Sequence, residues 1–255
     1  MIGACPHPGA VRSIVPSLEL SLVSVTTSRH FRCALLLVGA TSPLLASRVP
    51  AQAAVSGVVT IAERPGVRTS DLNDVVIWLE PLDAAGRPGG AATVPIVMSE
   101  RRYTPKVRLV SVGSTVEFPN QDPFRHNVFS KAGPTEFDLG LYDRGEVRRV
   151  RVAAPGVYPI FCNIHARMVA FVVAAPTAWS AQAEASGRFA IPGVPAGRYR
   201  LRTWHNRGGE QTREVEVPAE GLSNVSIALD ARTYRFVQHR NKFGKPYPPD
   251  GPDRY

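Results

Sequence analysis

A thiol, an imidazole and a thioether lie close together at Cys162, His165 and Met168, in the stretch FCNIHARM. The two sulfur groups are soft metal ligands and imidazole is a borderline one, so this combination is typical of a site for a transition metal. Copper sites of the trigonal kind use two imidazoles and one thiolate, with a thioether as a weak fourth contact. The stretch therefore requires a second histidine from another part of the chain.

His126 is the best candidate for that second imidazole. It begins a predicted strand in FPNQDPFRHNVFS, 36 residues before Cys162, which ends another predicted strand. The ends of strands gather at one pole of a β-sandwich, so these groups can converge. His205 is expected at the end of a strand as an ordinary structural residue, and His239 lies in a basic tail that is poorly suited to hold a rigid ligand.

The same residues admit three other interpretations. A structural zinc site usually takes several thiolates, and only one cysteine follows residue 53. A hydrolytic dyad of Cys162 and His165 lacks an evident oxyanion device and a third, orienting residue. The third interpretation is that each residue has an ordinary structural role, since such residue types are common in cores and turns: Met168, His126 and Cys162. Their joint order and flanking residues favour copper.

Short β-branched segments bounded by Gly, Pro and Asp make up the chain around these residues, and no segment has the pattern of an amphipathic helix. We expect strands at 55–62, 74–82, 94–99, 106–112, 114–120, 126–130, 147–153, 156–162 and 168–175, followed by short strands between 188 and 230. The acidic stretch EFDLGLYDRGEV, at 136–147, is expected to be a solvated loop. The pattern predicts an all-β protein built from sandwiches.

The N-terminus has the features of an export signal. Arg29 and Arg32 precede an apolar stretch at 33–46, and Ala51 and Ala53 are placed as a signal-peptidase site. We therefore expect residues 1–53 to be a leader and the protein to be periplasmic or extracellular. Cys5 and Cys33 would be removed with the leader, so Cys162 would be the one cysteine left and no internal disulfide could form. An unpaired thiol in an oxidising compartment is then explained if Cys162 binds a metal.

The charge and the hydropathy of the chain limit the kinds of partner that it can bind. The chain has 30 basic and 21 acidic residues and a net charge of +9. The leader contributes four arginines and one glutamate, which leaves 26 basic and 20 acidic residues, a net charge near +6. This charge suits an acidic partner or surface, but the basic residues are scattered and no nucleic-acid motif is present. No apolar run reaches the roughly 18–20 residues of a membrane span.

Residues 94–174 resemble the cupredoxins, the plastocyanin- and amicyanin-like blue copper proteins. The resemblance rests on YTPKVRLVSVGSTVEFPNQD, on the His-Asn pair in HNVFS, and on APGVYPIFCNIHARM with its Cys-x2-His-x2-Met spacing. It implies a Greek-key β-sandwich with His126, Cys162, His165 and Met168 as ligands of one type 1 copper ion. It also implies that the backbone N–H of Asn127 points at the cysteine sulfur, and that the imidazole of His165 reaches the surface as the exit point for the electron.

The flanking segments resemble a second family. Residues 55–90, with VSGVVTI and NDVVIWLEPLD, and residues 176–230, with SGRFAIPGVPAGRYRLRTWH, are similar to a carboxypeptidase-regulatory-like, or transthyretin-like, module. We expect one small β-sandwich that is interrupted by the copper domain; alternatively, 55–82 adds strands to the copper domain. Residues 231–255 form a basic, Pro-rich tail that we expect to be extended or disordered.

These resemblances imply an exported copper protein that transfers single electrons and performs no substrate chemistry of its own. Its donor and acceptor would be redox proteins, such as a dehydrogenase or a cytochrome, and similar arrangements occur in methylamine-utilisation proteins. Two alternatives stay open: a periplasmic copper carrier or sensor without redox cycling, and a cell-surface binding module with a vestigial copper site.

Overall fold

The computed structural model describes residues 53–248, so the predicted leader up to Gln52 and the last seven residues lie outside the described part. The predicted all-β fold is confirmed. Between residues 53 and 248, the one helical element is a single 3-10 turn, η1 (Leu72–Asp74). None of the described segments forms an apolar helix of the length that crossing a bilayer requires.

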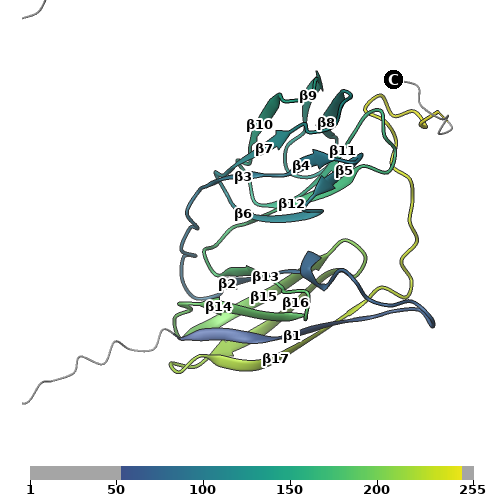
Figure 1. Ribbon diagram of the computed structural model, residues 1–255. Coiled ribbons are helices and arrows are strands. Elements are labelled where there is room, and N and C mark those ends of the chain that lie inside the picture. The colour runs from purple at the N-terminus through teal and green to yellow at the C-terminus, as the bar shows by residue number, and fades with distance from the viewer. Residues whose placement is uncertain (1–52, 249–255) are drawn as a thin grey trace, which may run out of the picture. The chain divides into compact units, whose positions relative to one another are not determined.

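The first sandwich is built from a continuous part of the chain between residues 93 and 175 (Figure 1). Its strands are β3 (Thr93–Pro95), β4 (Val97–Ser99), β5 (Arg102–Thr104), β6 (Val107–Ser111), β7 (Thr115–Pro119), β8 (His126–Ser130), β9 (Phe137–Tyr142), β10 (Val147–Arg151), β11 (Gly156–Phe161) and β12 (Val169–Ala175). One sheet has the order β10-β7-β3, the other β6-β12-β11-β8-β9, and β4 and β5 form a separate hairpin. Side chains from these sheets bury one common core, with Phe118, Val128 and Ile160 fully enclosed.

The second sandwich is assembled from both flanks of the first. Its strands are β1 (Ala54–Ala62), β2 (Val76–Pro81), β13 (Ser180–Gln182), β14 (Arg188–Pro192), β15 (Gly197–His205), β16 (Gly209–Val217) and β17 (Leu222–Asp230). The sheets have the orders β14-β1-β17 and β13-β2-β15-β16. β1 pairs antiparallel with β14 and parallel with β17, and β2 pairs antiparallel with β13 and β15. The strands of 54–81 therefore pair with the segment after Ala175, and not with the strands of 93–175.

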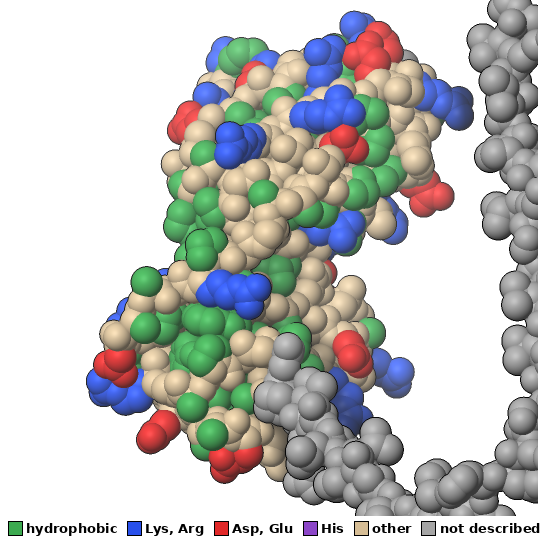
Figure 2. All heavy atoms as spheres, turned by 90° about the vertical axis from the view of Figure 1, so that its left-hand side faces the viewer, with side chains coloured by type: hydrophobic (Ala, Val, Ile, Leu, Met, Phe, Trp, Pro, Cys, Tyr) green, Lys and Arg blue, Asp and Glu red, His purple; other side chains and the backbone are tan. Residues whose placement is uncertain are grey.

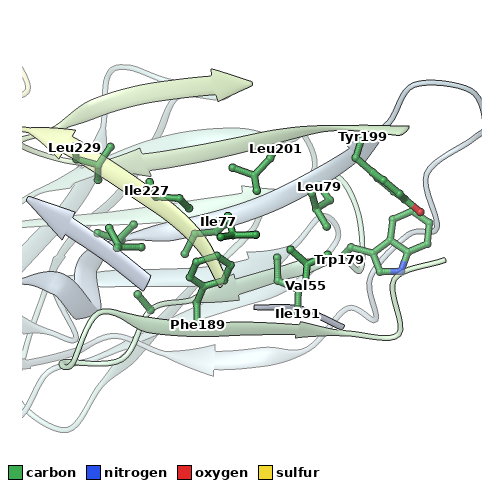
Figure 3. Close-up of a cluster of buried hydrophobic side chains, with 14 of the residues drawn as sticks. Val55, Ile77, Leu79, Trp179, Phe189, Ile191, Tyr199, Leu201, Ile227 and Leu229 are labelled. Carbon is green, nitrogen blue, oxygen red and sulfur yellow. The ribbon is translucent and has the colours of Figure 1, made fainter. Parts of the chain in front are cut away.

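The core of the second sandwich explains why the two distant segments associate. Figure 3 shows Val55 of β1 and Ile77 and Leu79 of β2 among side chains from β14, β15 and β17. Val55, Ile77 and Leu79 have no exposed surface. Each such side chain contributes on the order of 2 kcal/mol when it is removed from water, and neither segment can bury its apolar face alone.

The two sandwiches also share a small buried cluster. It contains Val107 and Val173 from the first sandwich and Val76, Trp78 and Trp204 from the second. The rings of Phe171 and Trp204 lie 5.2 Å apart between their centroids. On the face of the molecule in Figure 2, basic and acidic side chains are interspersed, so the excess of basic residues is not concentrated there.

Three parts of the first sandwich differ from the sequence-based expectation. One is β5 (Arg102–Thr104), a strand that was not expected. The segment expected as one strand at 94–99 is two strands, β3 and β4, which are separated by the fully buried Ile96. They are separate because β3 pairs with β7, whereas β4 pairs with β5. The acidic stretch from 136 on is not a solvated loop: it contains β9, which pairs antiparallel with β8. A register shift opposite Asn127–Phe129 and a left-handed Gly140, with φ of 73°, interrupt the alternation by which a strand is recognised.

The tail was also expected to be extended or disordered. Residues 231–248 contain no strand, but 239–247 contact the end of β11 and the loop that follows it (Figure 1). The segment 239–247 is held there because aromatic and polar side chains of the tail stack on, and form hydrogen bonds with, residues of the first sandwich.

Candidate metal centre

Three of the four predicted ligands converge at one end of the first sandwich. His126 is the first residue of β8, Cys162 follows the last residue of β11, and His165 lies in the loop between β11 and β12. β8 and β11 pair at Phe129 and Phe161, which fixes the distance between the histidine strand and the cysteine strand. The order of strands in the sheet thus brings together groups that are 36 residues apart.

The donor atoms form a small triangle. His126 Nδ1 lies 3.8 Å from Cys162 Sγ, His165 Nδ1 lies 3.6 Å from the same sulfur, and the two nitrogens are 3.1 Å apart. Nitrogen and sulfur donors bind such ions at about 2.0 and 2.3 Å, so near-trigonal donors around one ion are separated by about 3.3–3.7 Å. The observed triangle fits one metal ion with little movement of the side chains.

The second nitrogen of His126 is fixed by a carboxylate. His126 Nε2 lies 2.7 Å from Asp122 Oδ2. The same carboxylate accepts hydrogen bonds from the backbone N–H groups of Glu100, at 2.7 Å, and Arg101, at 3.0 Å. Glu100 and Arg101 form the tight turn between β4 and β5 and both have positive φ. Asp122 therefore ties the orientation of the imidazole to a rigid hairpin, which is the usual outer support of a metal-binding histidine.

The electrostatics of this pair favour a neutral imidazole whose Nδ1 is available. Burial acts to raise the pKa of Asp122, but hydrogen bonds from Arg101, His126 and Glu100 hold that pKa below its ordinary value. Burial lowers the pKa of His126, although the Asp122 carboxylate acts to raise it. With Asp122 ionised, His126 Nε2 donates its hydrogen to Oδ2 and Nδ1 presents its lone pair to the triangle.

The thiol of Cys162 is fully buried. Burial raises its pKa, and hydrogen bonds from the backbone N–H groups of Ile164, Asn127 and His165 oppose that rise. These N–H groups surround the position in which a thiolate would carry negative charge, so they would stabilise a metal-bound thiolate. The backbone N–H of Asn127 is thus directed at the sulfur, while its side-chain amide donates to Asp138 Oδ1 at 2.7 Å.

Met168 lies in the same buried cluster as Cys162, and 1% of its surface is exposed. Its carbonyl accepts the N–H of Cys162 at 3.3 Å, and its N–H donates to the carbonyl of His165 at 3.0 Å. These bonds close the segment from Cys162 to Met168 into a tight loop. That the thioether of Met168 reaches the metal stays a prediction.

Phe124 covers the imidazoles. Its ring centroid lies 5.2 Å from that of His126 and 5.6 Å from that of His165. His126 and Cys162 have no exposed surface, whereas His165 is partly exposed. The site is therefore largely dehydrated, and solvent reaches it at His165.

Sequence reasoning missed Asp122, Asp138 and Phe124. A signal was available for Asp122, which stands four residues before His126, at the spacing from which a carboxylate can return to the ring. Asp138 could not be found, because its role depends on the pairing of β9 with β8.

A second group of possible ligands consists of Asp71, Asp74 and His205. Both oxygens of Asp71 accept hydrogen bonds from Arg207, and Lys106 Nζ lies 3.2 Å from Asp74 Oδ2. His205 Nε2 lies 3.4 Å from Asp71 Oδ2. The carboxylates of this group already form ion pairs with Arg207 and Lys106, so the group is a structural ion-pair network. His205 is the last residue of β15, at the strand end where it was predicted.

No protein-family description and no curated protein sequence matches the chain. Among solved structures, a reduced variant of amicyanin aligns over 32% of this chain and 82% of its own length, with 22% identity and a TM-score of 0.31. The copper-containing nitrite reductase of Thermus scotoductus SA-01 aligns over 46% of this chain and 28% of its own, with 24% identity and a TM-score of 0.32.

A purple cupredoxin from Nitrosopumilus maritimus aligns over 34% of this chain and all of its own length, with 24% identity and a TM-score of 0.29. The structural neighbours are thus copper proteins with cupredoxin domains. At these TM-scores the likeness carries no argument about this chain, so the assignment of a metal rests on the donor atoms at the end of the first sandwich.

Proposed function

We propose that the protein is an exported single-electron carrier with one type 1 copper ion bound by His126, Cys162 and His165. Met168 is the weak fourth ligand in this proposal. The observation that supports it is the triangle of two Nδ1 atoms and one Sγ atom, with sides of 3.1, 3.6 and 3.8 Å. One thiolate with two imidazoles is the donor set of blue copper sites, and it is short of the several thiolates typical of structural zinc.

Bound copper would supply the Cu(II)/Cu(I) couple. The chain's own part is to hold the donors in place: Asp122 fixes His126, the β11–β12 loop fixes His165, and the N–H groups around Cys162 stabilise the thiolate. Burial of Cys162, and burial of His126 beside the ring of Phe124, exclude water. Because the ligands have little room to move, the energy needed to reorganise the site between two oxidation states is small.

Export, partners and the second sandwich complete the proposal. The apolar segment at 33–46 and the A-x-A site before residue 54 support secretion across a membrane. The partly exposed His165 supports transfer of the electron at that imidazole to a redox protein, such as a dehydrogenase or a cytochrome. The pairing of β1 with β14 and β17, and of β2 with β13 and β15, supports a carboxypeptidase-regulatory-like module. In this proposal the module contributes no substrate chemistry.

The test is the visible spectrum of the purified full chain after addition of Cu(II), followed by voltammetry. We expect an intense thiolate-to-copper charge-transfer band and a reversible one-electron wave. Cys162→Ser should abolish both, because the serine hydroxyl is a hard and weak ligand for copper. Cys33→Ser is the matched control and should retain both, since Cys33 lies outside the proposed site.

Three outcomes would contradict the proposal. Binding of Cu(I) without a coloured Cu(II) form would indicate a copper carrier. A colourless chain that prefers Zn(II) would indicate a structural site. A chain that binds none of these ions would leave the binding role to the second sandwich.

A further inference from the structure

The C-terminal segment 239–247, here called the C-terminal strap, contacts the metal-binding loop of the first sandwich. We propose that this strap is a positioning element that holds the Cys162–Met168 loop closed and thereby controls access to the thiol and the rate of metal loss. The proposal deepens the proposed function, because it concerns the same site. Its main test is made without metal, so the two can fail separately.

The first contact is at the ligand itself. Tyr247 Oη donates a hydrogen bond to the carbonyl oxygen of Cys162 at 2.7 Å, across 85 residues of sequence. On its other side, Cys162 donates its N–H to Met168 at 3.3 Å, a longer bond. The hydroxyl therefore fixes the peptide unit that follows the ligand, and with it the direction in which the loop leaves β11.

The second contact is aromatic. The ring of His239 stacks on Phe161, the last residue of β11, with centroids 4.1 Å apart and an angle of 26° between the planes. His239 Nδ1 lies 3.2 Å from Tyr247 Oη. Since the Tyr247 hydrogen is used on Cys162, its hydroxyl oxygen can only accept from His239. It shares the Nδ1–H of His239 with the backbone carbonyl oxygen of Arg240, which lies 3.0 Å from the same nitrogen. The two ends of the strap thus support each other at the point where β11 enters the loop.

The third contact joins the two ligand-bearing regions. The backbone N–H of Lys242 donates to Asn163 Oδ1 at 3.0 Å, next to Cys162. The side chain of the same residue reaches Asp138 Oδ2 with its Nζ at 2.7 Å. Asp138 accepts the amide of Asn127, the neighbour of His126. One lysine therefore connects the cysteine loop to the β8–β9 pair that carries the first imidazole.

These contacts are selective within the tail. Phe236, Val237 and Phe243 are the exposed large apolar residues of the tail, with 62%, 82% and 69% of their surface accessible. A tail attracted only by general hydrophobicity would bury these residues first. Instead, the residues held against the site are those with directed polar and stacking contacts, which is the pattern of a specific docking segment.

The test is the alkylation rate of Cys162 by iodoacetamide in the metal-free full chain, with Cys5 and Cys33 replaced by serine in every variant. The buried thiol reacts only when the loop opens, so the rate reports the population of the open form. We expect Tyr247→Phe to raise the rate about five-fold, the effect of one lost hydrogen bond. Lys242→Met, which keeps the apolar stem, should raise it about two- to five-fold.

Two matched controls come from the same tail. The hydroxyl of Tyr234 has no hydrogen-bond partner between residues 53 and 248, and the exposed Lys245 has no ion-pair partner among those residues. Tyr234→Phe and Lys245→Met should therefore keep the wild-type rate within two-fold. Equal rates in Tyr247→Phe, Lys242→Met and the wild type would overturn the proposal.

A second readout separates this inference from the electron-transfer function. In the Co(II)-loaded chain, release of the ion to excess chelator should be about five-fold faster in Tyr247→Phe than in Tyr234→Phe. Absence of the copper charge-transfer band in the wild type would overturn the proposed function and leave the alkylation result to decide the role of the strap. A copper charge-transfer band together with unchanged alkylation and release rates would support the proposed function and overturn the role of the strap.

Discussion

At the scale of single residues, Asp122 has the largest predicted effect outside the ligands themselves. It is 5% exposed and accepts hydrogen bonds from His126, Glu100 and Arg101. In Asp122→Asn, one oxygen becomes an NH₂ group, which cannot accept these bonds and competes with the donor of His126. We expect metal affinity to fall about 10- to 100-fold, measured by chelator competition.

Asp143→Asn is the control for that substitution. Asp143 is 73% exposed and lies 3.8 Å from Arg125, so its loss should leave the affinity unchanged. Equal affinities for Asp122→Asn and the wild type would show that His126 needs no carboxylate to orient it.

The pH dependence of metal binding also belongs to the residue scale. Burial raises the pKa of Cys162, so at neutral pH a proton must leave the sulfur when a metal binds. Burial lowers the pKa of His126, so this ligand is neutral above the ordinary histidine pKa of about 6.5. We expect Co(II) affinity to fall at least ten-fold when the pH is lowered from 7.5 to 6.5, by equilibrium titration. An affinity that does not change with pH would contradict a protonated resting thiol.

At the scale of elements, Gly57 determines how closely β1 approaches β17. A methyl group added at Gly57 would lie 1.9 Å from the carbonyl oxygen of Val225, a backbone atom that cannot turn away. We expect Gly57→Ala to lower the free energy of unfolding by about 1–3 kcal/mol, measured by urea denaturation. Gly90→Ala is the matched control, since no atom lies within 4 Å of the added methyl group, and it should be neutral or slightly stabilising.

The elements also show what the sequence could and could not predict. β8 (His126–Ser130) was predicted to the residue, because it is short, contains Val128 and Phe129, and is bounded by a proline turn and a glycine-containing loop. The Cys162 loop was recognisable because its ligand types are close in sequence. β9 was missed because its bulge at Gly140 interrupts the alternation of buried and exposed residues.

Contacts between distant segments account for the rest of what was missed. The bond from Tyr247 to Cys162 spans 85 residues, and a tyrosine in a Pro-rich tail carries no local signal for such a partner. The pairing of β1 (54–62) with β17 (222–230) likewise joins segments that are far apart in the sequence, and no local signal predicts it. The sequence indicated that both segments need apolar cover, but only the folded chain shows the register.

At the scale of the whole molecule, the buried cluster that includes Val107, Val173 and Trp204 links the stability of the two sandwiches. The three tryptophans of the chain, Trp78, Trp179 and Trp204, all belong to the second sandwich or to this cluster. Tryptophan fluorescence therefore follows the second sandwich and its contact with the first, whereas the candidate metal site lies at another part of the first sandwich. This separation gives a test of whether the molecule unfolds as one unit.

We expect a metal bound in the first sandwich to stabilise the second. A free Co(II) concentration of 100 times Kd stabilises a cooperative unit by about 2.7 kcal/mol. For a chain of this size, that corresponds to a rise of about 5–10 °C in the Tm followed by tryptophan fluorescence. A Tm that is unchanged in fluorescence but raised in the absorbance of the metal site would show that the sandwiches unfold separately.

The arrangement of the second sandwich determines the order in which the protein can be completed during synthesis. All strands of the first sandwich lie between residues 93 and 175, so they are available for pairing before the last five strands of the second have been translated. β1, by contrast, waits for β17, which ends at Asp230. The newly made chain must therefore keep the apolar residues of β1 apart from other partners until β17 is complete. From Ala62 to Asp230 this takes 168 further residues, about 8–34 s at 5–20 residues per second.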